Sequence, residues 1–188
     1  MAKGTASFLV LSDSHGHVPA LKAVLKWAHE EPAFDAALFL GDGNDDLPVA
    51  SRETGFTLPW YKVRGNGDYN FSIADSLIVE VPLDSKKIKK LFCAHGHRYG
   101  VERGALDIAE AAKKSGADAA LFGHTHTPYC GFHNGIFALN PGSIGRPREG
   151  LKNSFAVLTC PAEGPFNARF YCLEKNGSTL LVREKEQK

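Results

Sequence analysis

Short, largely apolar runs recur along the first third of the chain, and polar residues follow each run immediately. The runs occupy residues 7–11, 36–40 and 60–63. Continuous apolar runs of this kind are typical of strands that are covered on both faces. The pattern therefore predicts three buried strands, each with a polar loop at its carboxyl end.

Helical spacing of apolar residues appears between these runs and again later in the chain. A helix is predicted over residues 19–30, because Pro19 suits a first helical turn and four apolar residues follow at helical spacing: Leu21, Val24, Leu25 and Ala28. A weaker pattern predicts a short helix at residues 47–52. A third helix, with Gly116 suited to follow its end, is predicted around Ala105, Ile108, Ala109 and Ala112.

The remaining apolar runs predict further strands. Residues 76–81 and 87–94 are expected to be neighbouring strands joined by a turn at residues 82–85. Two more runs lie at residues 119–122 and 136–139. The last three follow one another without a helix between them and should therefore pair antiparallel: residues 155–159, 168–173 and 179–182. The charged tail at residues 183–188 is predicted to fray.

Together these elements predict an α/β fold, a four-layer α-β-β-α sandwich in which two mixed β-sheets pack face to face between helices. The chain has 188 residues, 43% of them hydrophobic, so a single domain over residues 1–188 is expected. The formal net charge of +1 gives no strong field that would favour nucleic acid or an anionic membrane. We therefore expect neither partner to be bound stably.

Location and cysteine chemistry follow from the same composition. No apolar stretch approaches the roughly 20 residues that span a bilayer, and no secretory leader precedes the first run, so a cytoplasmic protein is expected. The four cysteines are widely spaced and form no metal-binding pair, so buried free thiols are expected: Cys93, Cys130, Cys160 and Cys172.

The most informative segment for chemistry is the histidine pair His124-Thr125-His126, which follows the run at residues 119–122. Neutral imidazole is the commonest side-chain ligand of transition metals. In an extended segment the two rings would point to the same side, about 6.5–7 Å apart at Cα. That spacing suits ligands of one ion or of two adjacent ions, although the pair alone is a weak signal.

Other apolar runs also end in ligand-type side chains. In α/β proteins, bound molecules lie beyond the carboxyl ends of the strands. If the strands predicted here run parallel in a common sheet, their carboxyl ends bring seven such side chains to one edge. These are Asp13, His15, Asp42, Asn66, His95, His124 and His126. Taken singly, Asp13, Asp42 and Asn66 are each more typical of caps and turns. Turn chemistry explains the whole set poorly.

Seven ligands exceed what one first-row ion takes, so the set indicates two divalent metal ions. A carboxylate such as Asp42 has two oxygens and can bridge the ions. Nitrogen and oxygen ligands without thiolate suit Mn²⁺, Ni²⁺, Co²⁺, Fe²⁺ or Zn²⁺ better than Mg²⁺ or Ca²⁺, and we favour Mn²⁺. Two ions about 3.5–4 Å apart stabilise the attacking and leaving oxygens of a phosphoryl displacement.

The ordered motifs resemble the calcineurin-like metallophosphoesterase superfamily, and most of all its small single-domain bacterial and archaeal phosphodiesterases. The resemblance covers residues 7–145 and rests on Asp13-Ser-His15, Gly41-Asp42, Gly65-Asn66-Gly67-Asp68, His95-Gly-His97, Gly123-His124-Thr-His126 and Asn140-Pro-Gly-Ser143. It implies one metal site made by Asp13, His15, Asp42 and His126. It implies a second site made by Asp42, Asn66, His95 and His124, with a metal-bridging hydroxide as the nucleophile.

One position departs from the pattern of larger relatives, which carry a histidine directly after the asparagine as the proposed proton donor. Here that residue is Gly67, as is common in the small branch. His17 and His97 remain candidate donors, beside the alternative that the leaving group departs unaided. Asp42, His97 and Asp68 are candidate catalytic residues, although Asp68 is more simply a residue that orients a ligand histidine.

Substrate contacts are predicted less sharply than metal ligands. Asn66, His97 and Arg146 are candidate substrate-binding residues, because arginine pairs well with phosphate oxygens; Arg148 follows close by. A surface arginine in solvent is the simpler interpretation of Arg146. Four aromatic residues are expected to pack in the core rather than form a wall for a base: Trp60, Tyr69, Phe71 and Tyr99.

These residues favour a metal-dependent phosphodiesterase that hydrolyses a small phosphodiester. A phosphomonoesterase and a non-catalytic scaffold remain alternatives, since one trafficking subunit resembles this fold with a degraded site. All seven ligand positions are filled here, which favours the enzyme. The physiological substrate, the native metal and homo-oligomer formation stay open.

Overall fold

A computed structural model describes residues 4–31, 34–177 and 179–184 of the chain. Its larger sheet has six strands, in the spatial order β11 (Thr179–Glu184), β10 (Asn167–Asn176), β9 (Ser154–Pro161), β1 (Thr5–Leu11), β2 (Ala36–Phe39) and β3 (Trp60–Lys62). The strands β1, β2 and β3 run parallel, whereas β9, β10 and β11 pair antiparallel as predicted.

The second sheet has five strands, in the order β4 (Ser76–Pro82), β5 (Ile88–Ala94), β6 (Ala119–Leu121), β8 (Ile136–Pro141) and β7 (Pro128–His133). Here β5, β6 and β8 run parallel, and the outer strands β4 and β7 run antiparallel to their neighbours. Both sheets are therefore mixed, and each has a parallel core.

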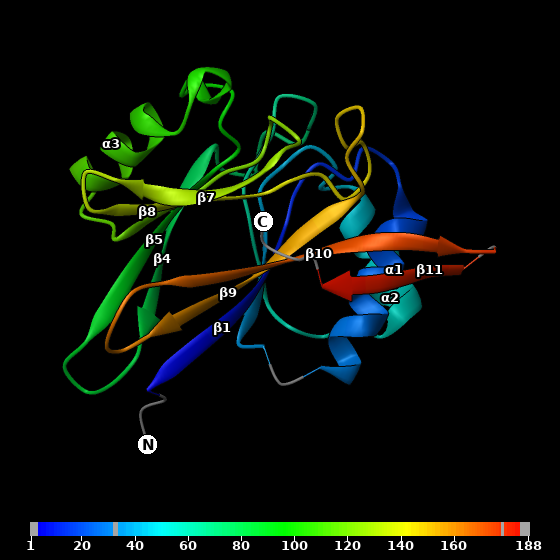
Figure 1. Ribbon diagram of the computed structural model, residues 1–188, viewed down its shortest axis with the longest axis horizontal. Helices are drawn as coiled ribbons and strands as arrows, with labels where there is room; N and C mark the ends of the chain where they lie inside the picture. Colours follow the sequence, from blue (N-terminus) through cyan, green and yellow to red (C-terminus); the bar gives the residue numbers. More distant parts are fainter. Residues whose placement is uncertain (1–3, 32–33, 178, 185–188) are drawn as a thin grey trace.

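Helices cover the outer faces of the two sheets (Figure 1). Alternating side chains of β1 explain the layering, because Val10 packs between the sheets with Leu91 and Leu121, whereas Leu9 packs beneath the helices. The larger sheet is covered by α1 (Val18–Glu30) and α2 (Asp46–Thr54), and the smaller by α3 (Leu106–Lys114). The predicted α-β-β-α sandwich is confirmed.

Two elements were not predicted from the sequence. The edge strand β7 contains a proline, a glycine and several exposed residues, which hide the pattern of a strand. A single 3₁₀ turn, η1 (Val101–Arg103), precedes α3. In the tail, Arg183 and Glu184 belong to β11, so fraying is wrong for these two; residues 185–188 lie outside the described residues.

Candidate metal centre

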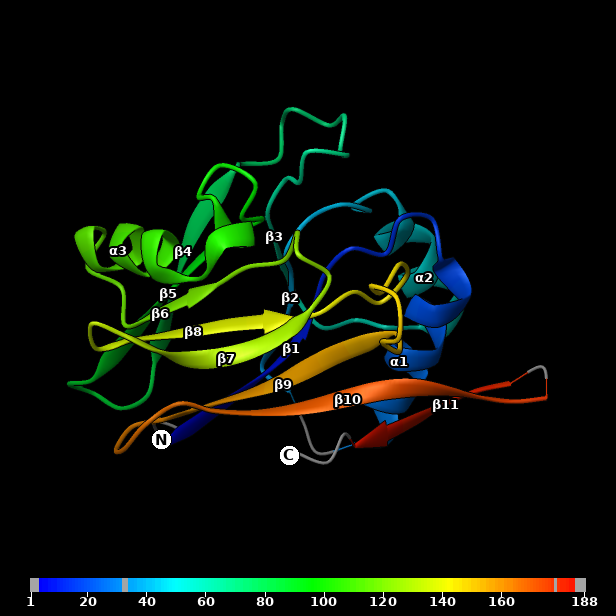
Figure 2. The same ribbon diagram turned by 45° about the horizontal axis from the view of Figure 1, so that its top comes forward.

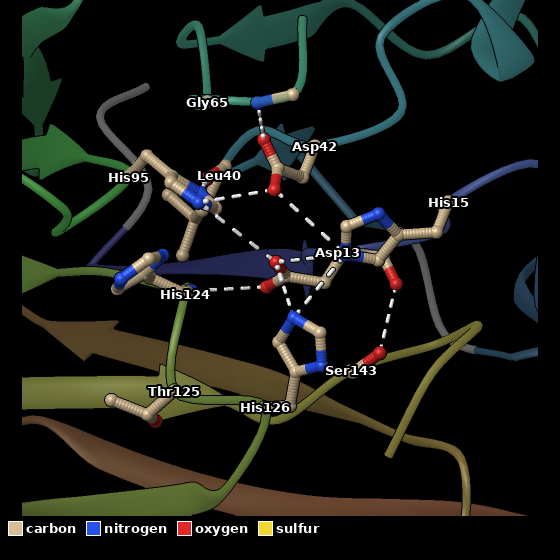
Figure 3. Close-up of polar contacts among 12 residues, drawn as sticks. Asp13, His15, Leu40, Asp42, Gly65, His95, His124, Thr125, His126 and Ser143 are labelled. Carbon is tan, nitrogen blue, oxygen red and sulfur yellow. Dashed lines mark hydrogen bonds and ion pairs between the residues drawn. The ribbon is translucent and has the colours of Figure 1, made fainter. Parts of the chain in front are cut away.

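The predicted ligands come from the carboxyl ends of strands in both sheets, not from one sheet. Loops after β1, β2 and β3 carry Asp13, His15, Asp42 and Asn66, whereas loops after β5 and β6 carry His95, His124 and His126. The premise of a common sheet is thus wrong. All of these side chains except that of Asn66 still meet (Figure 3), because strands of the two packed sheets end at the same edge of the sandwich.

Asp13 lies at the middle of the cluster and contacts ligands from both sheets. Its Oδ1 lies 3.1 Å from Nε2 of His126 and 3.7 Å from Nε2 of His15. The two imidazole nitrogens are themselves 3.2 Å apart. These three residues form a group whose ligand atoms all lie within 4.8 Å of one another.

A second group shares Asp13 and adds Asp42 and His95, and all three residues are buried. Nε2 of His95 lies 3.5 Å from Oδ2 of Asp42 and 3.9 Å from Oδ1 of Asp13. Oδ2 of Asp42 also lies 3.8 Å from Nε2 of His15, which links the two groups. Asp13 therefore belongs to both groups, and Asp42 of the second group lies beside His15 of the first.

The loop that carries Asn66 lies directly against Asp42. The N–H of Gly67 donates to Oδ1 of Asp42 over 2.6 Å. A Cβ at Gly65 would lie 2.0 Å from the same oxygen, so only glycine allows this approach. Asn66 is exposed between these two glycines, beside the carboxylate that the sequence predicts as the metal bridge.

Left-handed backbone conformations concentrate at the predicted ligands. Among the described residues, six that are not glycine have positive φ, and five of them are predicted metal ligands: Asp13, His15, Asp42, His124 and His126. Such conformations cost about 1–3 kcal/mol each and gather at functional sites. The segment from His124 to His126 is consequently bent rather than extended as expected, and its rings lie in different halves of the cluster.

In His95 and His126, a hydrogen bond at one ring nitrogen leaves the other ring nitrogen available as a metal ligand. Nδ1 of His95 donates to the Leu40 carbonyl over 2.7 Å, and Nδ1 of His126 donates to the Arg146 carbonyl. Because a carbonyl only accepts, each Nδ1 carries a proton and each neutral ring keeps a lone pair on Nε2. Metal-binding histidines are commonly oriented in this way.

The carboxylates and imidazoles of the cluster stabilise one another's charged forms. Burial alone would raise the pKa of Asp13, but His126 and His15 outweigh it and hold that pKa well below its usual range. Burial opposes the charged form of His95 too, yet its pKa is raised because Asp42 and Asp13 lie close. The cluster therefore combines anionic oxygens with basic nitrogens.

Two polar atoms of this cluster are buried without a hydrogen-bond partner, namely Oδ1 of Asp13 and Nε2 of His95. Such atoms are costly unless something satisfies them. Two ligand atoms that bind one divalent ion at right angles, each about 2.1 Å from it, lie about 3.0 Å apart. This is close to the 3.1 Å between Oδ1 of Asp13 and Nε2 of His126, and to the 3.2 Å between the Nε2 atoms of His15 and His126. The donor set thus fits divalent metal ions.

Asp68 organises the loops around Asp42 rather than facing the cluster. Its carboxylate accepts from the backbone N–H groups of Asp42, Gly43, Asn44 and Gly65, and from the Asn44 side chain. Burial would raise the pKa of Asp68, but these N–H groups lower it. This geometry indicates a positioning role, while the predicted catalytic role stays untested.

Asp46 and Ser143 were not predicted as parts of the centre, but they hold the loop that follows β1. The Asp46 carboxylate accepts from the Ser14 hydroxyl and from the Gly16 N–H. The Ser143 hydroxyl donates to the Asp13 carbonyl over 2.8 Å. In the sequence, Asp46 is typical only of an acid in the first turn of a helix, and Ser143 belongs to the family motif Asn140-Pro-Gly-Ser143 without an assigned role.

The remaining predicted residues lie at different distances from the centre. His97 is half-buried with its ring 5.5 Å from that of His95, and burial lowers its pKa. His17 caps α1 by accepting from the Ala20 N–H, and lines a separate surface cavity of about 360 Å³. The side chain of Arg146 is exposed, and its carbonyl holds His126.

Comparison with known proteins explains this arrangement. The model of the calcineurin-like phosphoesterase superfamily domain matches residues 7–163. The chain belongs to this superfamily. Calcineurin-like phosphoesterases use divalent metal ions, and the two groups around Asp13 are where this member brings candidate ligands together. The resemblance found in the sequence motifs is confirmed.

Relatives of this calcineurin-like chain include bacterial proteins of similar length. It is 30% identical to the probable metallophosphoesterase YsnB of Bacillus subtilis, over 87% of this chain and 89% of that one. It is 29% identical to phosphodiesterase YfcE of Escherichia coli, over 78% and 84% of the two chains. The relatives support a hydrolase acting on phosphate esters.

Solved structures show the same fold more widely. The structure of YfcE, a phosphoesterase from E. coli, superposes with a TM-score of 0.59 over 81% of this chain and 87% of that one. Vps29 of Chaetomium thermophilum superposes with a TM-score of 0.69 over 95% of each chain. At 19% sequence identity, this is a likeness of fold alone. Among the helices that the structure describes, none is long and apolar enough to cross a membrane.

Proposed function

We propose that the protein is a binuclear metal-dependent phosphodiesterase that hydrolyses a small phosphodiester. One ion would be held by Asp13, His15, Asp42 and His126, and the other by Asp42, Asn66, His95 and His124. The observation that carries this proposal is the pair of buried, unpartnered ligand atoms on Asp13 and His95, with the Asp42 carboxylate beside both. Mn²⁺ is the favoured ion, with Ni²⁺, Co²⁺, Fe²⁺ or Zn²⁺ as alternatives.

When bound, the two ions would supply an activated hydroxide as the nucleophile and would neutralise the charge of the phosphate. The residues of the chain orient these parts. Asp42, held by the N–H of Gly67, would keep the ligand sets together. Asn66, His97 and Arg146 would contact the phosphodiester, and His97 is the candidate that would protonate the leaving group, because Gly67 offers no proton.

The test compares hydrolysis of bis(p-nitrophenyl) phosphate by the wild type and by Asp42→Asn, each loaded with Mn²⁺. The variant should lose at least about 100-fold in kcat, because an amide bridges two cations poorly. Asp107→Asn makes the same chemical change at an exposed residue of α3 and should retain wild-type turnover. Near-normal turnover by Asp42→Asn would contradict the bridging role.

A non-catalytic scaffold remains the second candidate, because the fold is shared with Vps29. Elemental analysis of the purified, reconstituted protein separates the two. Two ions per chain with diester turnover supports the enzyme, whereas less than one ion and no turnover supports the scaffold. Comparing mono- and diester rates at the same metal concentration then separates a phosphomonoesterase from a phosphodiesterase.

A further inference from the structure

Two aromatic side chains in the loop that follows Gly67 are exposed to an unusual degree. Tyr69 is 84% exposed and Phe71 is 77% exposed, in the segment between β3 and β4 that projects beyond the sheets in Figure 2. Core packing, as expected from the sequence, is correct for Trp60 and Tyr99 but wrong for these two. Two such rings exposed in one short segment, two residues apart in the sequence, indicate a binding surface.

Phe71 is held in place despite its exposure. The Arg64 guanidinium lies over the ring, with Cζ 4.9 Å from its centroid. Arg64 is itself largely buried and forms an ion pair with Asp75. The guanidinium of Arg64 covers one region of the Phe71 ring and leaves most of the ring surface open. Because this contact already restrains the ring, the Phe71 side chain has little conformational freedom left to lose when a ligand binds.

The same contacts connect the aromatic loop to the metal centre. Asp75 also pairs with Arg98 over 3.2 Å, and Nε of Arg98 lies 3.4 Å from Nε2 of His97. At the other end of the loop, Gly67 donates to the Asp42 carboxylate, two residues before Tyr69. The loop is therefore anchored directly to Asp42 at one end and, through Asp75 and Arg98, to His97 at the other.

We propose that Tyr69 and Phe71 form a stacking platform for a planar aromatic group of the substrate, so that the preferred diesters contain a nucleoside. This inference rests on the proposed function, since the phosphate has to lie at the metal centre. Stacking of a base on an aromatic side chain is strong and tolerant of base identity. The cation of Arg98, which is 60% exposed and contacts both Asp75 and His97, suits the anionic backbone of such a substrate.

Isothermal titration of the Mn²⁺-loaded protein with two ligands tests the platform without relying on turnover. AMP and ribose 5-phosphate share the sugar and the phosphate and differ in the base. The wild type should bind AMP roughly tenfold more tightly than ribose 5-phosphate. In Phe71→Ala and Tyr69→Ala, the ratio of the affinity for AMP to that for ribose 5-phosphate should fall toward one. The affinity for ribose 5-phosphate and the metal content should stay unchanged.

Phe132→Ala is the matched control, because Phe132 is 58% exposed but lies on β7, outside the loop. It should keep the wild-type preference for AMP. Equal affinity of the wild type for both ligands overturns the platform while leaving the metal centre intact. Binding of neither ligand to metal-loaded protein overturns the proposed phosphoesterase site as well. A wild-type dimer that Phe71→Ala converts to a monomer assigns the loop to self-association and overturns the proposal.

Discussion

Nε2 of His124 lies 2.6 Å from Oε1 of Glu102, so a residue of the turn η1 orients a predicted metal ligand of the loop after β6. The backbone N–H of Glu102 itself, together with His124, lowers the pKa of this carboxyl, which is therefore an ionised acceptor at neutral pH. Nε2 must then carry the proton in a neutral His124, which leaves the lone pair on Nδ1.

Replacing Glu102 should therefore weaken metal binding without removing a predicted ligand. We expect Glu102→Ala to lower the affinity of the proposed site that includes His124 by about 10–100-fold, the usual effect of losing the partner of a ligand histidine. Glu102→Gln keeps an oxygen acceptor and should lose less. Mn²⁺ titration calorimetry measures both. Tighter binding by Glu102→Ala would instead make Glu102 a competitor for His124.

Asp68 offers a test of how the loops are held. Removing its carboxylate leaves several N–H groups without an acceptor, so Asp68→Ala should lower the free energy of unfolding by about 3–5 kcal/mol. Urea unfolding in the presence of chelator measures this change apart from metal binding.

Asp84→Ala is the control for that measurement. Asp84 likewise accepts from backbone N–H groups, those of Lys86 and Lys87, but in an exposed turn where water replaces the acceptor. Its loss should cost less than about 1 kcal/mol. Equal unfolding midpoints for the two variants would show that the Asp68 network contributes no special stability.

The sequence predicted the strand ends and the candidate ligand residues that follow them, because buried strands and polar loops differ sharply in local pattern. It did not predict that Asp42 and His95 come from different sheets, since strand pairing depends on contacts between distant segments. Glu102 was missed for the same reason: only the tertiary fold brings it to His124. The bend at His124 also escaped prediction, because Asn140, far along the chain, fixes it by donating to the Gly123 carbonyl.

Metal binding should raise thermal stability, since an ion that binds only the folded state stabilises it. At about 100 times its dissociation constant, Mn²⁺ should add about 2.7 kcal/mol and raise the Tm by about 5–10 °C. Asp13→Asn should abolish most of this shift, because Asp13 belongs to both ligand groups. Asp107→Asn should keep it. An undiminished shift in Asp13→Asn, measured by scanning calorimetry, would remove Asp13 from the ligand set.

The four cysteines report on the two packed sheets independently of the metal centre. Burial raises the pKa of Cys93 to about 12 and that of Cys160 to about 11, and Cys172 is also buried. Cys130, on the edge strand β7, is exposed, contrary to the expectation of a buried thiol; although partial burial raises its pKa too, it should react with DTNB at pH 8 faster than the three buried thiols. All four should react in denaturant.

Cys130→Ser should remove the rapid phase and leave the slow one unchanged. Raising the pH should accelerate Cys130 first, because the thiolates of Cys93 and Cys160 form only as the pH nears their raised pKa values. A second rapid thiol at pH 8 would show that the layer between the sheets, where Cys93 and Cys160 pack, opens more readily than its buried contacts imply.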